Sequence, residues 1–312
     1  MSSVVRRTVL PLPALVTLAL VAAGCGSAAP TGDAGASGKQ IVAVGAENEY
    51  ANVISQIGGP YVAVTAIMSD PNTDPHTFEA SPSVAEVVSA ARLIVQNGVG
   101  YDDFMGKIES ASPSSSRHMI DVQKLLGLPD ATPNPHLWYK PGTMPAVATA
   151  VASALSALQP QHAAFFQANV VKFDRSLVPW TMALEQFRAA YGGTPVATTE
   201  PVADYVLSAA DADNLTPFDL QADIMNGVDP APQNVSLEND LFSRHRVKAF
   251  LYNRQVTDSV TQAFLRTAVG NGVPVVAVYE TMPPGYDYQG WMLAEVQALR
   301  KAVASQISTH AL

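Results

Sequence analysis

The chain contains very little cysteine, and this absence narrows the kinds of site it can build. Cys25 is the only cysteine among the 312 residues. One thiol cannot form a disulfide within the chain, and a thiolate zinc cluster needs several cysteines. The sequence therefore excludes a fold held by internal disulfides. A metal site would have to rely on nitrogen and oxygen ligands.

Basic residues are also scarce. Lys and Arg number 18 against 27 Asp and Glu, which gives a formal net charge of −9 and a pI near 5.0. Nucleic-acid binding needs clustered Lys and Arg to meet the phosphates, and the sequence has no such cluster. We therefore expect no nucleic-acid partner. The acidic balance is an ordinary surface property, and it does not hinder the capture of a cation.

Several common catalytic motifs are missing as well. The sequence has no His-Glu-x-x-His helix, no Gly-x-Ser-x-Gly turn and no phosphate-binding loop. We therefore expect that the protein is not an enzyme. Apolar sequence is plentiful, since hydrophobic residues make up 48% of the chain and charged residues 14%. That composition can bury one large core or two medium ones, and two lobes are the better expectation.

The N-terminus, residues 1–25, is predicted to be a lipoprotein signal peptide. Arg6-Arg7 precede an apolar run over residues 8–23, which is too short and wrongly flanked for a membrane-spanning helix. The run ends in Ala22-Ala23-Gly24-Cys25, which resembles the lipobox of bacterial lipoproteins, in which the cysteine becomes the lipid-modified first residue. An ordinary secretory signal with an incidental cysteine is the alternative, and Ala22 in place of the more usual leucine keeps it open.

Residues 26–39 are predicted to be a flexible tether. They consist almost entirely of Gly, Ala, Ser, Pro and Thr, a composition that cannot bury enough apolar surface to become ordered. The folded part is therefore expected to begin at residue 40. It would stand outside the cytoplasm, lipid-anchored to the cell membrane through Cys25.

From residue 40 onward, short apolar runs alternate with helical segments in two series. The first series has predicted strands at 41–44, 61–67, 93–95 and 119–122, and helices at 49–58, 83–90, 102–110 and 145–158. The second has strands at 195–199, 249–253 and 273–279, and helices at 202–209, 237–244, 260–269 and 290–305. Such alternation predicts an α/β fold with two lobes, 40–158 and 192–312, each a mostly parallel sheet flanked by helices. Ligands bind such sheets beyond the carboxyl ends of the strands.

Residues 159–191 are predicted to link the two lobes through a long helix. The stretch 162–191 carries no strong turn signal except Pro179. A continuous helix of that length would measure about 45 Å, which is longer than a lobe needs and suits a strut between lobes. Pro179 predicts a kink. Two ordinary helices separated at Pro179 are the alternative.

Two histidines share one uncommon setting. His76 ends the tripeptide Asp74-Pro75-His76, and His136 ends Asn134-Pro135-His136. Proline fixes its own backbone angle and restricts the residue before it, so each imidazole is presented from a stiff loop, as a metal site requires. The remaining histidines lack this setting and are expected to be surface or packing residues: His118, His162, His245 and His310.

Two glutamates, Glu200 and Glu280, directly follow predicted strands of the second lobe. Taken singly, Glu200 could be a first-turn acid that complements a helix dipole, and Glu280 an ordinary loop residue. Their shared placement favours one metal site made of His76, His136, Glu200 and Glu280. Imidazole and carboxylate ligands suit Zn²⁺ or Mn²⁺, and affinity order alone favours zinc. Carboxylates that bind through both oxygens would raise the coordination number and favour Mn²⁺ or Fe²⁺.

Residues 40–305 resemble the zinc and manganese solute-binding lipoproteins of bacterial ABC importers. The resemblance is carried by Asp74-Pro75-His76, Asn97-Gly98-Val99-Gly100-Tyr101-Asp102, Asn134-Pro135-His136-Leu137-Trp138, Thr199-Glu200-Pro201-Val202-Ala203-Asp204-Tyr205 and Val278-Tyr279-Glu280-Thr281. It implies two α/β lobes joined by a long helix, with the metal in the cleft between them and two ligands from each lobe. His76, His136 and Glu200 match ligand positions of the family, whereas Glu280 stands where aspartate is commoner. A glutamate as third ligand goes more with manganese, and the His-rich loop of many zinc members is missing, so the metal stays open between Zn²⁺ and Mn²⁺.

On this resemblance, the protein is expected to be a monomeric carrier that binds one divalent metal ion and presents it to an ABC importer permease with its ATPase. Partners that orient metal-bound histidines are expected around the site, and Asp102, Asp103, Trp138 and Tyr205 are candidates. Two alternatives stay open. A surface lipoprotein adhesin would also suit the tether and anchor, and a secreted metallohydrolase would need an open position for a metal-bound water.

Overall fold

The computed structural model describes residues 39–312. The predicted signal peptide with Cys25, and all of the predicted tether except its last residue, lie outside the described residues. Within residues 39–312, no helix combines the length and the apolar character needed to cross a membrane.

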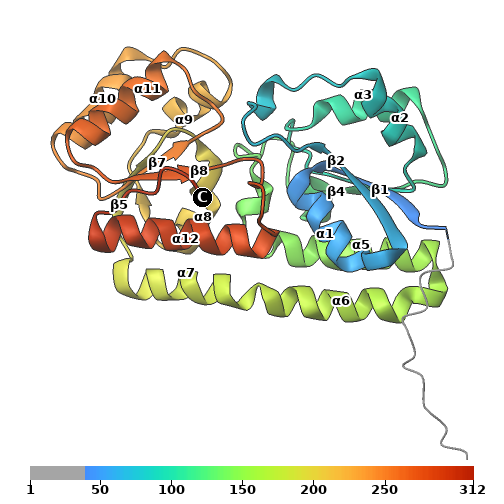
Figure 1. The fold of residues 1–312 in the computed structure, drawn as a ribbon. Coiled ribbons are helices and arrows are strands. Elements are labelled where there is room, and N and C mark those ends of the chain that lie inside the picture. Colours follow the sequence, from blue (N-terminus) through green and yellow to red (C-terminus); the bar gives the residue numbers. More distant parts are fainter. Residues whose placement is uncertain (1–38) are drawn as a thin grey trace, which may run out of the picture. The chain divides into compact units, whose positions relative to one another are not determined.

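The first lobe is built on a parallel four-stranded sheet in the order β2-β1-β3-β4 (Figure 1). Its strands are β1 (Ile41–Glu47), β2 (Val62–Met68), β3 (Leu93–Gln96) and β4 (His118–Asp121). Its helices are α1 (Asn48–Gly58), α2 (Pro82–Ala90), α3 (Asp103–Ala111), α4 (Val122–Leu125) and α5 (Thr143–Leu158). Strand β1 is buried on both faces, because Ala43 packs in one hydrophobic core with α1 and α5, and Val44 packs in another with α2 and α3. This double burial explains why the strand reads as a continuous apolar run.

The second lobe repeats this plan with a parallel sheet in the order β6-β5-β7-β8. Its strands are β5 (Pro195–Thr198), β6 (Asp213–Asn214), β7 (Phe250–Asn253) and β8 (Val275–Val278). Its helices are α8 (Asp204–Ala209), α9 (Phe218–Met225), α10 (Pro232–Ser243), α11 (Ser259–Gly270) and α12 (Tyr288–Ser305). The predicted fold class, two α/β lobes with parallel sheets, is confirmed. Strand β6 and helix α9 were not predicted, and α10 begins earlier than the expected residue 237.

The segment between the lobes is two helices, not one. α6 (Ala163–Ser176) and α7 (Val178–Tyr191) follow one another end to end and are separated only at Leu177, whose backbone angles stay helical (φ −80°, ψ −14°) (Figure 1). Pro179 has no N–H to donate to the carbonyl one turn earlier. At the junction, the Leu177 backbone N–H donates to the backbone carbonyls of both Phe173 and Asp174, at 3.3 Å each. The expected single helix is therefore interrupted two residues before the proline.

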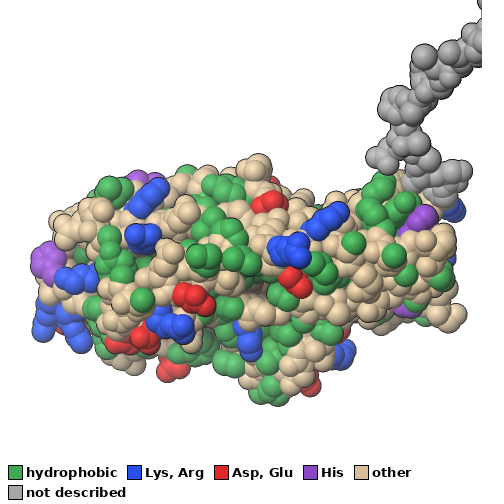
Figure 2. All heavy atoms as spheres, turned by 90° about the horizontal axis from the view of Figure 1, so that it is seen from below, with side chains coloured by type: hydrophobic (Ala, Val, Ile, Leu, Met, Phe, Trp, Pro, Cys, Tyr) green, Lys and Arg blue, Asp and Glu red, His purple; other side chains and the backbone are tan. Residues whose placement is uncertain are grey.

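These two helices form a base under both lobes. α6 packs on α5 and α7 packs on α12. Their outer face exposes the apolar side chains of Val171, Val178 and Met182. Figure 2, which views this side, shows apolar side chains in scattered patches among charged ones. One hydrophobic core runs through the first lobe, both base helices and the adjoining part of the second lobe, so packing as well as covalent linkage holds the lobes together.

Short 3₁₀ turns complete the fold: Gly59–Tyr61, Pro75–Thr77, Leu137–Tyr139, Pro160–His162 and Pro201–Ala203. Three of them stand beside predicted metal ligands. His162 belongs to another, where its ring stacks on Tyr61 with 3.8 Å between ring centroids. This packing agrees with the expectation that His162 is not a ligand.

One buried acid of the second lobe gives the fold a pH dependence. Glu238 on α10 is fully buried, and its Oε1 accepts a hydrogen bond from the Thr216 hydroxyl at 3.3 Å. Burial raises the pKa of Glu238 to about 8 from an ordinary value of 4.5, and the Thr216 hydrogen bond opposes this only in part. The folded protein therefore keeps a proton that the unfolded chain releases. The free energy of unfolding must therefore fall as the pH rises from about 4.5, the ordinary pKa of a glutamate, to about 8, the pKa of Glu238 in the folded protein.

We expect the melting temperature of wild-type protein to fall by a few degrees more than that of Glu238→Gln between about pH 5 and about pH 8. The amide cannot ionise, so its burial costs the same at both values. Thermal unfolding followed by circular dichroism measures the difference. Glu185→Gln, at an exposed position of α7, should keep the wild-type slope. Parallel curves for wild type and Glu238→Gln would contradict the prediction.

Candidate metal centre

Both Asx-Pro-His motifs form turns in which the Asx side chain caps the histidine that follows. Asp74 Oδ1 accepts a hydrogen bond from the His76 backbone N–H at 2.9 Å. Asn134 Oδ1 accepts one from the His136 backbone N–H at 3.0 Å. These bonds add to the stiffness of the prolines, so each ring starts from a fixed backbone position. His76 lies on the segment after β2, and His136 lies just before the Leu137–Tyr139 turn.

The imidazole of His136 is held in one orientation. Its Nδ1 lies 2.8 Å from Asn134 Oδ1, an acceptor, so Nδ1 carries the proton and Nε2 presents a lone pair. The ring is fully buried, and the Trp138 ring packs edge-on against it with 5.4 Å between centroids. A histidine held in this tautomer is ready to bind a metal through Nε2.

Glu280 from the second lobe meets both histidines. It follows β8, is buried, and its Oε2 lies 3.1 Å from His136 Nε2 and 3.2 Å from His76 Nε2. Among the described residues, His76, His136 and Glu280 form a group whose ligand atoms all lie within 4.8 Å of one another. Two ligand atoms of one tetrahedral zinc ion stand about 3.3 Å apart. The spacing therefore suits three ligands of one ion.

Glu200 is placed beside this group but is not part of it. It follows β5, is buried, and its Oε1 accepts a hydrogen bond from Asn253 Nδ2 at 3.1 Å. The same Nδ2 donates to Glu280 Oε1 at 2.6 Å. Its other oxygen, Oε2, is buried and has no hydrogen-bond partner among residues 39–312. The structure therefore links the two glutamates through one amide, and it brings Glu280 but not Glu200 within ligand distance of the two histidines.

The ionisable side chains of the centre shift one another's pKa values. Burial alone would raise the pKa of Glu280, but the charge of His76 and the hydrogen bond from that ring outweigh it and hold that pKa well below its usual range. Burial lowers the pKa of His136. Burial also opposes protonation of His76, but the negative charge of Glu280 outweighs it, so the pKa of His76 is raised. Burial, followed by the charge of Glu280, raises the pKa of Glu200 well above 4.5. The two shifts have opposite directions: the contacts of the centre favour a negative charge on Glu280 and disfavour a second one on Glu200.

Sequence reasoning missed three side chains that shape this centre. The Tyr101 hydroxyl donates to Glu280 Oε2 at 3.0 Å, and Asn253 joins the two glutamates. Gln255 Oε1 accepts hydrogen bonds from the backbone N–H groups of Glu280 and Thr281 at 2.6 and 2.8 Å. Asn253 and Gln255 stand at the end of a predicted strand, the edge where ligands bind, so their position was an available signal.

The four residues that were expected to support the metal-bound histidines make different contacts. Trp138 packs on His136, and the Tyr205 hydroxyl donates to the Asn134 carbonyl at 2.9 Å. Asp102 instead accepts from the backbone N–H groups of Asn97 and Gly98, at 2.6 and 2.9 Å. Asp103 is exposed at the start of α3. Two of the four candidates therefore touch a histidine or its motif.

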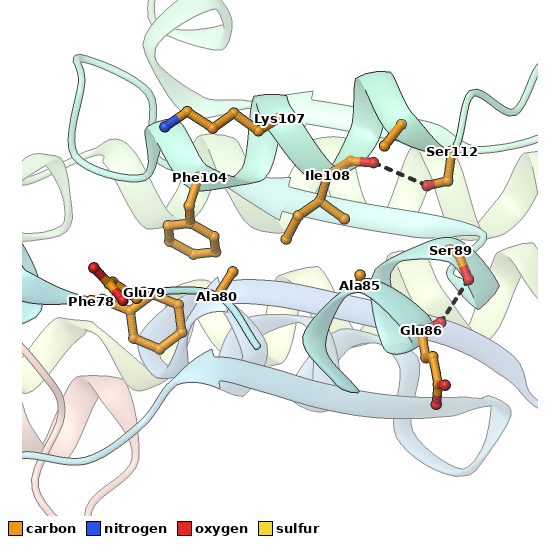
Figure 3. Close-up of a pocket in the computed structure, with 11 residues that line it drawn as sticks. Phe78, Glu79, Ala80, Ala85, Glu86, Ser89, Phe104, Lys107, Ile108 and Ser112 are labelled. Carbon is orange, nitrogen blue, oxygen red and sulfur yellow. Dashed lines mark hydrogen bonds between the residues drawn. The ribbon is translucent and has the colours of Figure 1, made fainter. Parts of the chain in front are cut away.

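A hollow of about 790 Å³ opens beside α2 and α3 (Figure 3). Phe78 and Phe104 pack against each other at one side of it, with 4.7 Å between ring centroids, and the Lys107 amine points away. Its lining includes the exposed acids Glu79 and Glu86 but no histidine. This hollow is therefore separate from the metal centre.

The sequence matches a known protein family over most of its length. Residues 44–302 match a family model described as zinc-uptake complex component A, periplasmic. The manganese-binding lipoprotein MntA of Bacillus subtilis (strain 168) is 25% identical over 178 residues, 55% of this chain and only 56% of that protein. A putative metal-binding protein of Treponema pallidum (strain Nichols) is 20% identical over 283 residues, which are 84% of this chain and 86% of that protein.

Solved structures show the same fold. The crystal structure of ZnuA has a TM-score of 0.69 at 20% identity and covers 85% of this chain and 100% of that chain. The periplasmic zinc-binding protein TroA from Treponema pallidum has a TM-score of 0.70 at 16% identity, with 86% and 100% covered.

The two capping residues give a matched test of the centre. We expect Asn134→Ala to weaken metal binding by about 10- to 100-fold, because it removes the acceptor that orients the His136 ring. Asp74→Ala should cost less, because the hydrogen bond from His76 to Asp74 comes from the backbone. Competition titration with a chromophoric chelator measures both. Equal losses in the two variants would show that the ring contact does not matter.

Proposed function

This chain belongs to the family of periplasmic A components of zinc-uptake complexes, and on that premise we propose that it captures one divalent transition-metal ion outside the cytoplasm and delivers it to an ABC importer. The observation that carries the proposal is the meeting of His76 and His136 from one lobe with Glu280 from the other around a single carboxylate oxygen. The transported ion would replace the proton shared within this group.

The ligand set that we propose is His76, His136, Glu200 and Glu280. Glu200 is included because its Oε2 is buried without a partner among the described residues, and because its other oxygen shares a donor with Glu280. A small movement of the Glu200 side chain would bring it to the ion. Four protein ligands complete a tetrahedral shell, whereas catalytic zinc keeps a position for water. The centre therefore supports a carrier over a metallohydrolase.

The ion would enter and leave past His76. Its side chain is 22% exposed, while the side chains of His136 and Glu280 are 0% exposed. Behind them the two lobes are tied by hydrogen bonds, among them a reciprocal pair between the Asn48 amide and the Met282 backbone at 2.9 and 3.0 Å. We infer that the segment around His76 moves when metal is released to the permease and its ATPase, while the deeper ligands stay in place.

We expect His76→Ala and Glu280→Ala to abolish stoichiometric metal binding, because each removes one of the converging ligands. Glu200→Ala should weaken binding by at least the 10- to 100-fold typical of a lost supporting contact. Metal content by mass spectrometry, after exposure of residues 40–312 to equal free zinc and manganese, measures all three. His310→Ala, at an exposed position, is the control and should bind like wild type.

The same variants separate transport from adhesion. A carrier without His76 and Glu280 should no longer support growth in metal-depleted medium. Surface adhesion that survives the loss of all four ligands would support the adhesin alternative. Wild-type metal content in His76→Ala would overturn the proposed site.

We propose that Cys25 carries the lipid that anchors the protein outside the cytoplasm. The family is described as periplasmic, and the lone cysteine stands in the predicted lipobox. Cys25→Ser should move the protein from the membrane fraction to the soluble extracytoplasmic fraction, and should remove incorporation of radiolabelled fatty acid. Unchanged membrane association and labelling would contradict the anchor.

A further inference from the structure

One amide joins the two proposed glutamate ligands. Asn253 ends β7 and is fully buried. Its Nδ2 donates to Glu280 Oε1 at 2.6 Å and to Glu200 Oε1 at 3.1 Å. A primary amide nitrogen has two hydrogens, so one can serve each carboxylate.

The orientation of this amide is set by its neighbours. Asn253 Oδ1 accepts a hydrogen bond from the Gln255 backbone N–H at 3.0 Å, and an N–H group cannot accept in return. The Asn253 backbone N–H donates to Thr199 Oγ1 at 3.0 Å, which fixes the start of the side chain. Nδ2 must therefore face the glutamates.

In each carboxylate, one oxygen accepts a hydrogen bond from Asn253 and the other is free to bind a metal. On Glu280, Oε1 is engaged by Asn253, and Oε2 faces both imidazoles. On Glu200, Oε1 is engaged, and Oε2 is buried without a partner among the described residues. A metal that took both oxygens of either carboxylate would compete with the Asn253 donors. Buried donors left unpaired are costly.

We propose that Asn253 is a positioning residue that holds Glu200 and Glu280 in one-oxygen coordination and thereby makes the site prefer four-coordinate Zn²⁺ over Mn²⁺. The inference rests on the proposed function and adds the choice of metal to it. Zinc is satisfied by four ligands in a tetrahedron, whereas Mn²⁺ favours six, mostly oxygen. Of the four proposed ligands only His76 is exposed, so we expect water to reach a bound ion from that side alone.

The first test reads coordination directly in wild-type protein loaded with Co²⁺ as a probe. Tetrahedral Co²⁺ absorbs visible light much more strongly than six-coordinate Co²⁺, so the inference expects intense visible bands. Weak, six-coordinate bands would overturn the inference and leave the carrier function intact. Failure to bind Co²⁺, Zn²⁺ or Mn²⁺ at all would overturn the proposed function itself, and the inference with it.

The second test uses Asn253→Ala beside Gln255→Ala. Asn253→Ala should lower the ratio of zinc to manganese affinity by about 10- to 100-fold and weaken the Co²⁺ bands, because both carboxylates are freed to bind through two oxygens. Gln255→Ala removes the acceptor for the Glu280 and Thr281 backbone N–H groups and the donor to the Thr73 carbonyl and the Thr281 hydroxyl, but it touches no carboxylate oxygen. It should weaken both metals in proportion and leave the ratio and the bands unchanged.

An unchanged ratio and spectrum in Asn253→Ala would show that Asn253 is merely structural and would overturn the inference. Thermal unfolding identifies a variant that fails to fold. In that case the wild-type Co²⁺ spectrum decides alone.

Discussion

The carboxylate of Glu280 is the group on which the rest of the centre depends. A buried charge is tolerated only when it is paired and hydrogen-bonded, and Glu280 obtains this from His76 and His136 of the opposite lobe, from Tyr101 and from Asn253. Each partner comes from a different part of the chain, so the contact exists only when both lobes are folded and in place. The same contact places the ligand atoms of His76, His136 and Glu280 within 4.8 Å of one another.

The surrounding structure keeps the two lobes at the spacing this contact requires. Besides the shared apolar core, the Tyr139 hydroxyl donates to the Tyr279 carbonyl at 2.7 Å, next to Glu280, and Asn134 Nδ2 donates to the Pro201 carbonyl at 2.6 Å, next to Glu200. The residues that flank the ligands therefore also tie the lobes together. His76 is the exposed edge of this otherwise buried contact.

Much of this could be predicted from sequence because it depends on local patterns. Apolar runs such as 41–44 and 273–279 identified buried strands, and the repeated Asx-Pro-His identified both histidines. Strand β6 has only two residues, Asp213–Asn214, and is too short and polar for any periodicity to show. The roles of Asn253 and Tyr101 could not be predicted, because they depend on which side chains from separate lobes meet, and no local pattern records that.

The central claim is that one ion lies between the lobes on two histidines and two glutamates. Anomalous diffraction at the zinc absorption edge, from crystals of the zinc-loaded protein, tests it most directly. The account predicts a single strong peak about 2.0–2.2 Å from one atom each of His76, His136, Glu200 and Glu280. A peak elsewhere, or an occupied site in which neither oxygen of Glu200 contacts the ion, would contradict it.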